Sequence, residues 1–146
     1  KKNLLKRTKG NIINIVDQRV LNLTPFFTTY TLTKSSLWTL TKTLAMALAP
    51  NIRVNAISAG PIKTLAATGI GDFRFILKWN ELNAPLKRNV SQDDVGNSAL
   101  YLLSDLGSAV TGEILHVDCG YHTVGMVAVD EAIKVSELLS EFDKGQ

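Results

Sequence analysis

The sequence predicts an α/β fold in which helices cover a parallel β-sheet. Three short runs of mainly apolar, partly β-branched residues predict buried strands at residues 11–16, 52–57 and 112–117. The segments between these runs carry apolar residues at helical spacing. Strands that alternate with helices indicate parallel βαβ units, and we expect their crossover connections to be right-handed.

The first predicted strand follows Gly10, and the irregular residues 18–27 after it predict a loop. A helix is then expected over about residues 28–48. Four leucines at intervals of three or four residues predict its apolar face: Leu37, Leu40, Leu44 and Leu48. Pro50 predicts the end of this helix, because proline cannot continue a helical hydrogen-bond pattern.

The second half of the chain continues the alternation of strands and helices. Gly60-Pro61 ends the second strand, and residues 65–80 have weak helical character. The run Ser91-Gln-Asp-Asp94 matches a capping box, in which a serine and an acid three residues later close the start of a helix. The third strand ends before Asp118, and residues 129–142 predict a terminal amphipathic helix.

The composition argues against several functional classes. With 45% hydrophobic and 20% charged residues, the chain predicts a packed globular protein. No apolar run reaches the roughly 18–20 residues that cross a bilayer, so no membrane partner is expected. The net charge of +3 comes from five basic residues among residues 1–10, which leave 11 basic against 13 acidic groups elsewhere. We therefore expect no nucleic-acid partner.

A glycine-rich phosphate-binding loop does not follow the first predicted strand. Doubly wound folds that bind dinucleotides carry Gly-x-Gly-x-x-Gly at that point, and residues 11–23 contain no such motif. We therefore expect the C-terminal part of a Rossmann-like doubly wound parallel sheet, with the N-terminal phosphate-binding half absent. Residues 1–126 are expected to form the C-terminal catalytic part of this one domain, and residues 127–146 a C-terminal tail.

Tyr30 and Lys34 are candidates for acid–base chemistry. They stand four residues apart on a predicted helix, so their side chains share one face. A free tyrosine has a pKa near 10, and a neighbouring ammonium group lowers it, which makes a tuned proton donor. Asp17 ends the first strand thirteen residues before Tyr30, and the loop between them can bring the two together. The alternative is a tyrosine in the core and a lysine in solvent.

Three further motifs accompany these residues: Ile52-Arg-Val-Asn-Ala-Ile-Ser-Ala-Gly-Pro-Ile-Lys-Thr64, Val110-Thr-Gly-Glu113 and His116-Val-Asp-Cys-Gly120. Together, over roughly residues 9–126, the pattern resembles the short-chain dehydrogenase/reductase family. The resemblance implies NADH or NADPH as cofactor. It also implies that Tyr30 donates a proton to the reduced substrate or stabilises its oxyanion. Lys34 would hold the nicotinamide ribose and lower the pKa of Tyr30.

The resemblance also implies contacts for the segment after the second strand. Ile62 would contact the nicotinamide carboxamide through its backbone, and Thr64 would approach the pyrophosphate. Gly60 and Pro61 would form a turn against the cofactor, which is compatible with a plain strand-ending turn. The resemblance also implies a mobile lid over an acyl chain, formed by six apolar residues: Leu65, Ile70, Phe73, Phe75, Ile76 and Trp79. Among them, Leu65, Phe73 and Ile76 would contact the substrate. Their alternative is ordinary core packing.

The resemblance divides near residues 52–56. Upstream, Asp17, Tyr30 and Lys34 resemble the pteridine reductase group, which has Asp where most of the family has Ser. A carboxyl group there can pass a proton through tyrosine or water to a ring nitrogen. Downstream, residues 52–126 resemble bacterial enoyl-acyl-carrier-protein reductases. Those enzymes usually place the active tyrosine seven residues before the lysine, and that position is Phe27 here.

We therefore expect an NAD(P)H-dependent reductase, foremost an enoyl-acyl-carrier-protein reductase of fatty acid biosynthesis, in an incomplete or hybrid chain. The alternatives are a pteridine or dihydrofolate reductase, and a non-catalytic fragment that needs association. The expected partners are an acyl-carrier-protein thioester or a pteridine, and further copies of the chain in a homotetramer or homodimer, in the cytoplasm. The isolated chain is expected to be inactive.

No metal site is expected, because His116 and His122 lack a set of partner ligands in the sequence. One cysteine, Cys119, allows neither an internal disulfide nor a cysteine-rich metal site. We expect it to be a small buried residue rather than a nucleophile, because no histidine and asparagine arrangement surrounds it.

Overall fold

The computed structural model describes residues 10–23, 27–64 and 73–126, together with residues 133–134, 136–137 and 140. The described chain divides into two compact units. The first combines the residues up to Ala59 with Ser91–Val117, and the second combines Gly60–Val90 with the residues from Asp118 onward. Among the described residues, no helix is long and apolar enough to cross a membrane.

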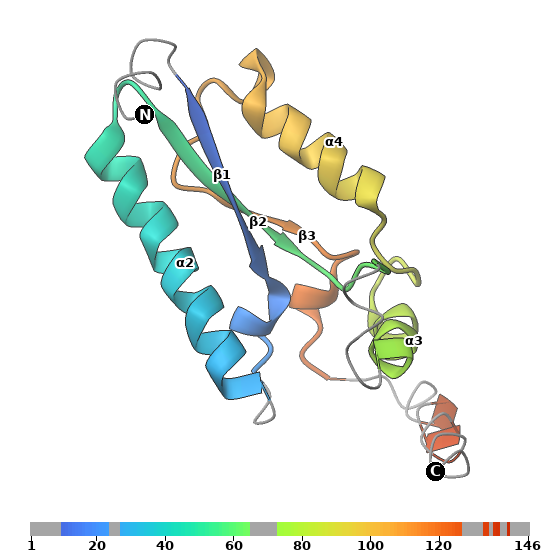
Figure 1. The fold of residues 1–146 in the computed structure, drawn as a ribbon. Helices are drawn as coiled ribbons and strands as arrows, with labels where there is room; N and C mark the ends of the chain where they lie inside the picture. The colour runs from blue at the N-terminus through green and yellow to red at the C-terminus, as the bar shows by residue number, and fades with distance from the viewer. Residues whose placement is uncertain are drawn as a thin grey trace. The chain divides into compact units, whose positions relative to one another are not determined.

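The first unit contains a three-stranded parallel sheet in the order β1 (Asn11–Asp17), β2 (Arg53–Ala59) and β3 (Ile114–Val117) (Figure 1). In the pairing register, Asp17 lies beside Ala59, and Ala59 lies beside Val117. The carboxyl ends of all three strands therefore meet at one edge of the sheet. The predicted α/β fold with a parallel sheet is confirmed.

Helices α2 (Thr28–Leu48) and α4 (Gln92–Leu103) cover opposite faces of the sheet (Figure 1). Asn14 donates to the Thr41 hydroxyl of α2, whereas Asn11 donates to the Leu103 carbonyl of α4. Residues three apart on a strand point to opposite faces, so the two helices lie on different sides. Each connection leads to the next strand in the same direction across the sheet, from β1 to β2 and from β2 to β3, but the two helices lie on opposite faces. The two connections therefore have opposite hands. The expectation that both are right-handed is therefore wrong for one of them.

Two apolar clusters hold α2 against the sheet. In one, Leu37 and Trp38 pack on a buried set from all three strands: Val16, Ala56 and Ile114. In the other, Leu44 and Leu48 pack near Ala45, Ile52 and Val54. The predicted apolar face is wrong at Leu40, which is 45% exposed. Thr41 and Ala45 take the sheet-facing positions instead, and Asn14 satisfies the buried Thr41 hydroxyl.

Helix α4 begins as its sequence predicts. The Ser91 hydroxyl accepts from the Asp94 N–H, and the Asp94 carboxylate accepts from the Ser91 N–H. This capping box satisfies two backbone donors that have no partner inside the helix. The short 3-10 helices η1 (Gln18–Val20) and η4 (Asp105–Gly107) follow β1 and α4.

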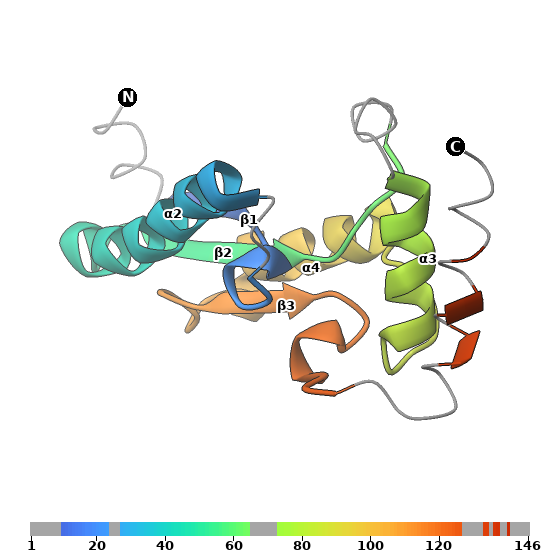
Figure 2. The same ribbon diagram turned by 90° about the horizontal axis from the view of Figure 1, so that it is seen from below.

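The second unit is built from α3 (Phe73–Asn83) and the 3-10 helix η5 (Tyr121–Thr123), both visible in Figure 2. The Trp79 indole N–H donates to the Tyr121 hydroxyl over 2.8 Å, and the Leu86 N–H donates to the Cys119 carbonyl. The predicted helical character of residues 65–80 holds from Phe73 onward, and residues 65–72 lie outside the described residues. Most of the predicted terminal helix over residues 129–142 also lies outside the described residues. So does the segment 1–9, which carries the five N-terminal basic residues.

Candidate active site

Asp17 and Tyr30 meet at the carboxyl edge of the sheet. The Tyr30 hydroxyl donates to Asp17 Oδ2 over 2.7 Å. The other carboxylate oxygen, Oδ1, accepts from the backbone N–H of Arg19 over 2.8 Å, which caps η1. Asp17 is the last residue of β1, and Tyr30 lies in the first turn of α2. The strand end and the helix start therefore hold the carboxylate and the phenol in contact.

Lys34 lies one turn further along α2, near the ring of Tyr30. Its Nζ is 5.7 Å from the ring centroid of Tyr30 and donates to the Ile15 carbonyl over 2.9 Å. The structure thus brings the three predicted catalytic residues together. Tyr30 is 40% exposed, which rules out the alternative of a tyrosine buried in the core.

The pKa of Tyr30 is raised well above its usual value of 10. Partial burial is the largest cause, followed by the hydrogen bond to Asp17 and the negative charge of Asp17, while Arg19 acts in the opposite direction. On balance the pKa of Tyr30 is thus raised, and a lowering by Lys34 stays a prediction. The Lys34 ammonium is engaged with the Ile15 carbonyl, and Asp17 is the group that touches the phenol. Tyr30 is consequently a neutral hydrogen-bond donor at neutral pH.

Arg19 and Phe27 complete the surroundings of this pair. The guanidinium carbon of Arg19 lies 4.0 Å from the centroid of the Phe27 ring, and Phe27 precedes the first residue of α2. Sequence reasoning identified Phe27 only as a position that lacks a hydroxyl, and it missed Arg19. Nothing in the spacing of these two residues, eight apart in a predicted loop, indicates that they stack.

The predicted cofactor segment, Gly60–Thr64, follows β2 directly. Ala59 pairs with Asp17 in the sheet, so this segment starts from the carboxyl edge, where α/β proteins bind ligands. A Cβ at Gly60 would lie 3.1 Å from the Asp118 Cα and 3.2 Å from a methyl carbon of Val90. Close backbone packing within the second unit is therefore a sufficient reason for glycine here. The contacts predicted for Pro61, Ile62 and Thr64 stay predictions.

The predicted substrate residues are placed only in part. Leu65 and Ile70 lie outside the described residues. Phe73, Phe75, Ile76 and Trp79 are half-buried on α3, where the rings of Phe75 and Trp79 lie 5.9 Å apart. Their role as a lid stays a prediction.

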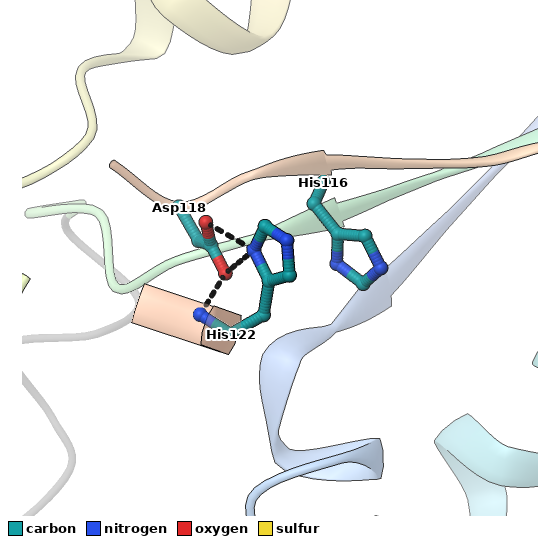
Figure 3. Close-up of side chains that lie close together, drawn as sticks. All are labelled: His116, Asp118 and His122. Carbon is teal, nitrogen blue, oxygen red and sulfur yellow. Dashed lines mark hydrogen bonds and ion pairs between the residues drawn. The ribbon is translucent and has the colours of Figure 1, made fainter. Parts of the chain in front are cut away.

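Asp118 organises the turn that precedes η5. It is 1% exposed, and its carboxylate accepts from the backbone N–H groups of Gly120 and His122. The His122 Nδ1 lies 3.0 Å from both carboxylate oxygens. Figure 3 draws these contacts as dashed lines. His116, also drawn there, belongs to β3 and lies against Trp38, with ring centroids 5.8 Å apart.

Asp118 and His122 are residue types that bind metals, but their contacts give both a structural task. The Asp118 carboxylate accepts hydrogen bonds from two backbone N–H groups, which need acceptors because the turn is buried. Sequence reasoning considered the two histidines without Asp118 and missed this pairing. The prediction that the chain binds no metal stays a prediction.

Replacing Gly120 by alanine is expected to destabilise the protein by roughly 2 kcal/mol. Gly120 has φ of 86°, a conformation that side chains disfavour, and an added Cβ would lie 2.9 Å from Cγ of Pro85. Chemical denaturation measures the effect, with Gly125→Ala as the control because a Cβ there meets no atom within 4 Å. Equal stability of the two variants would show that this turn relaxes freely.

Comparisons with known proteins extend this description. The family model for enoyl-(acyl carrier protein) reductase matches residues 1–122. An NADH-dependent enoyl-acyl-carrier-protein reductase of Rhizobium meliloti is 61% identical over 122 residues, which cover 83% of this chain and 45% of the relative. An NADPH-dependent reductase of Staphylococcus aureus is 62% identical over 92 residues, which cover 62% of this chain and 36% of the relative.

Solved structures match the fold as well. The enoyl-acyl-carrier-protein reductase of Anaplasma phagocytophilum in complex with NAD is 48% identical, with a TM-score of 0.79, over 88% of this chain and 49% of that one. The Bacillus cereus enzyme with NADP⁺ is 46% identical, with a TM-score of 0.76, over 80% of this chain and 46% of that one. The matches thus span between 36% and 49% of the length of these relatives. With a family model that matches 122 of its 146 residues, it belongs to the enoyl-acyl-carrier-protein reductases within the short-chain dehydrogenase/reductase family.

Proposed function

We propose that the chain is the catalytic part of an NAD(P)H-dependent enoyl-acyl-carrier-protein reductase of fatty acid biosynthesis. The observation that carries the proposal is the 61% identity to the Rhizobium meliloti reductase over 122 residues. The proposed substrate is an enoyl thioester of acyl carrier protein, handled in the cytoplasm. The related enzymes are named for NADH in one case and NADPH in another, so both cofactors belong to the proposal.

The donor groups at the carboxyl edge of the sheet suit a nicotinamide cofactor. In the proposal, the Lys34 ammonium and the Tyr30 hydroxyl bind ribose hydroxyls, and the closeness of Lys34 to the Tyr30 ring supports this. In the proposal, Ile62 holds the carboxamide through its backbone, Thr64 approaches the pyrophosphate, and Gly60-Pro61 forms the turn beside them. The bound cofactor supplies a hydride to the substrate double bond.

Tyr30 has a defined task in this reaction. Hydride addition to an enoyl thioester places negative charge on the thioester oxygen. Tyr30 exchanges its acceptor on Asp17 for that oxygen and donates its O–H to the developing charge. A phenol whose pKa is raised keeps its proton at neutral pH, which suits hydrogen bonding to an oxyanion.

Pteridine reduction is the second candidate, and the contact between Tyr30 and Asp17 favours it. In that reaction a protonated Asp17 gives its proton to the Tyr30 oxygen while the Tyr30 O–H proton moves to a ring nitrogen. Tyr30 regains one proton and loses one, so it ends neutral and Asp17 ends ionised. Phe27, at the position where enoyl reductases usually carry tyrosine, also favours this candidate.

Self-association into a homotetramer or homodimer is part of the proposal. Both α2 and α4 leave large apolar side chains exposed, listed here with their exposed fractions: Leu32 (63%), Met46 (77%), Leu100 (64%) and Leu103 (50%). Exposed apolar groups on these two helices, one on each face of the sheet, suit contacts between copies of the chain.

An assay with both substrates tests the proposed function. The chain is joined behind the phosphate-binding half of an enoyl reductase and supplied with NADH or NADPH. Crotonyl thioester turnover is expected, with dihydropteridine turnover as the comparison. Reduction of pteridine alone would overturn the first candidate in favour of the second. Turnover of neither, in a folded protein, would support the reading of a non-catalytic fragment.

A further inference from the structure

We propose that Arg19 is a positioning residue for the Tyr30–Asp17 pair, with its guanidinium held on the ring of Phe27 immediately before α2. The inference deepens the proposed function, on which it rests for the catalytic use of Tyr30. It assigns Arg19 a task that the sequence pattern assigns to Lys34.

The first support is the way Arg19 connects the two elements that carry the pair. Arg19 lies in η1, two residues after Asp17, and its backbone N–H fixes Asp17 Oδ1 over 2.8 Å. Its guanidinium carbon lies 4.0 Å from the centroid of Phe27, immediately before α2. One residue therefore contacts both the end of β1 and the start of the helix that carries Tyr30.

The second support is the balance of charges around the phenol. Two charged side chains contact Tyr30: Asp17 accepts from its hydroxyl and Lys34 lies near its ring. The charge of a third, Arg19 in η1, acts on the phenol as well. Asp17 opposes ionisation of the phenol, and Arg19 favours it. Lys34 donates a hydrogen bond to the Ile15 carbonyl rather than to the phenol. Arg19 is thus the cation that partly offsets the effect of Asp17 on the Tyr30 hydroxyl.

The third support is the chemistry of the stack. A planar guanidinium over an aromatic face is a favourable cation–π contact, and arginine makes it better than lysine. The contact restricts a long side chain that would otherwise sample many rotamers. Phe27 stands at the position where enoyl reductases usually carry tyrosine. Its ring is the aromatic platform on which the Arg19 guanidinium stacks.

The test is a titration of the Tyr30 phenol in the full chain, without substrate or cofactor. A fluorinated tyrosine, whose phenol is more acidic, is incorporated at position 30, and ¹⁹F NMR follows its ionisation as the pH rises. Arg19→Gln is expected to move the midpoint upward by roughly half a pH unit, and Asp17→Asn to move it downward. Phe27→Leu, which keeps the charge but removes the platform, is expected to move it upward by less.

Lys42→Gln is the matched control, because Lys42 is an exposed cation on α2 beyond the site. It is expected to leave the midpoint unchanged. A midpoint that Arg19→Gln leaves unchanged or lowers would overturn the proposal, even if the melting temperature falls, because a merely structural role changes stability alone. Should Arg19→Gln not fold, Arg19→Lys replaces it, with a smaller upward shift expected and no shift contradicting the proposal. Enoyl turnover is not measured in this experiment, so failure of the proposed function is seen separately.

Discussion

Replacing Tyr30 by phenylalanine is expected to lower turnover of the joined protein by about a hundredfold or more. The substitution keeps the ring and removes only the hydroxyl that donates to Asp17. The developing negative charge on the substrate oxygen then has no phenol to donate to it, whereas substrate binding keeps its apolar contacts. The loss should therefore appear in kcat more than in KM, which steady-state kinetics with crotonyl thioester measures.

Tyr101→Phe is the matched control, because Tyr101 is 40% exposed on α4, as Tyr30 is on α2. It is expected to keep full turnover. Unchanged turnover in Tyr30→Phe would remove Tyr30 from the chemistry and would leave the function to another group. A loss of pteridine turnover without a loss of enoyl turnover would instead assign Tyr30 to the second candidate reaction.

The local elements of this fold could be predicted because their signals lie within a few residues of one another. Alternation of β-branched and apolar runs with helical segments predicts β1, α2 and β2 within one or two residues of their observed bounds. The capping box at Ser91 defines the start of α4 in the same way. The predictions for Leu40 and for the hand of one connection were wrong because they depend on which face each helix covers. That choice depends on tertiary contacts such as the one between Asn14 and Thr41.

The candidate site shows the same division. Asp17, Tyr30 and Lys34 were identified from spacing and family resemblance, and the structure brings them together. The sequence did not predict which group each charged side chain contacts. Whether a lysine one helical turn away faces a phenol or a strand carbonyl depends on the path of β1, which placed Ile15 within reach of Lys34. The stack of Arg19 on Phe27 depends likewise on how a loop folds back.

Asn55→Ala is expected to lower the free energy of unfolding by about 2–4 kcal/mol. Asn55 lies in the central strand β2 and is 1% exposed. Its amide nitrogen donates to the Val110 carbonyl over 2.9 Å, and its amide oxygen accepts from the Glu113 N–H over 3.0 Å. The side chain thus fastens the turn that leads into β3. Alanine removes both bonds and leaves the Glu113 N–H without this acceptor in a place where water does not easily replace it.

The size of this effect depends on burial rather than on the loss of an asparagine, and a second variant separates the two. Asn51→Ala makes the same chemical change at an exposed position four residues earlier, where surface substitutions cost within about 0.5 kcal/mol. Chemical denaturation of both variants measures the difference. The Val110 carbonyl keeps a hydrogen bond from Arg53 over 3.1 Å, so the cost in Asn55→Ala falls mainly on the Glu113 N–H. Equal stability of the two variants would mean that water reaches this N–H, and that the sheet does not depend on Asn55 to position β3.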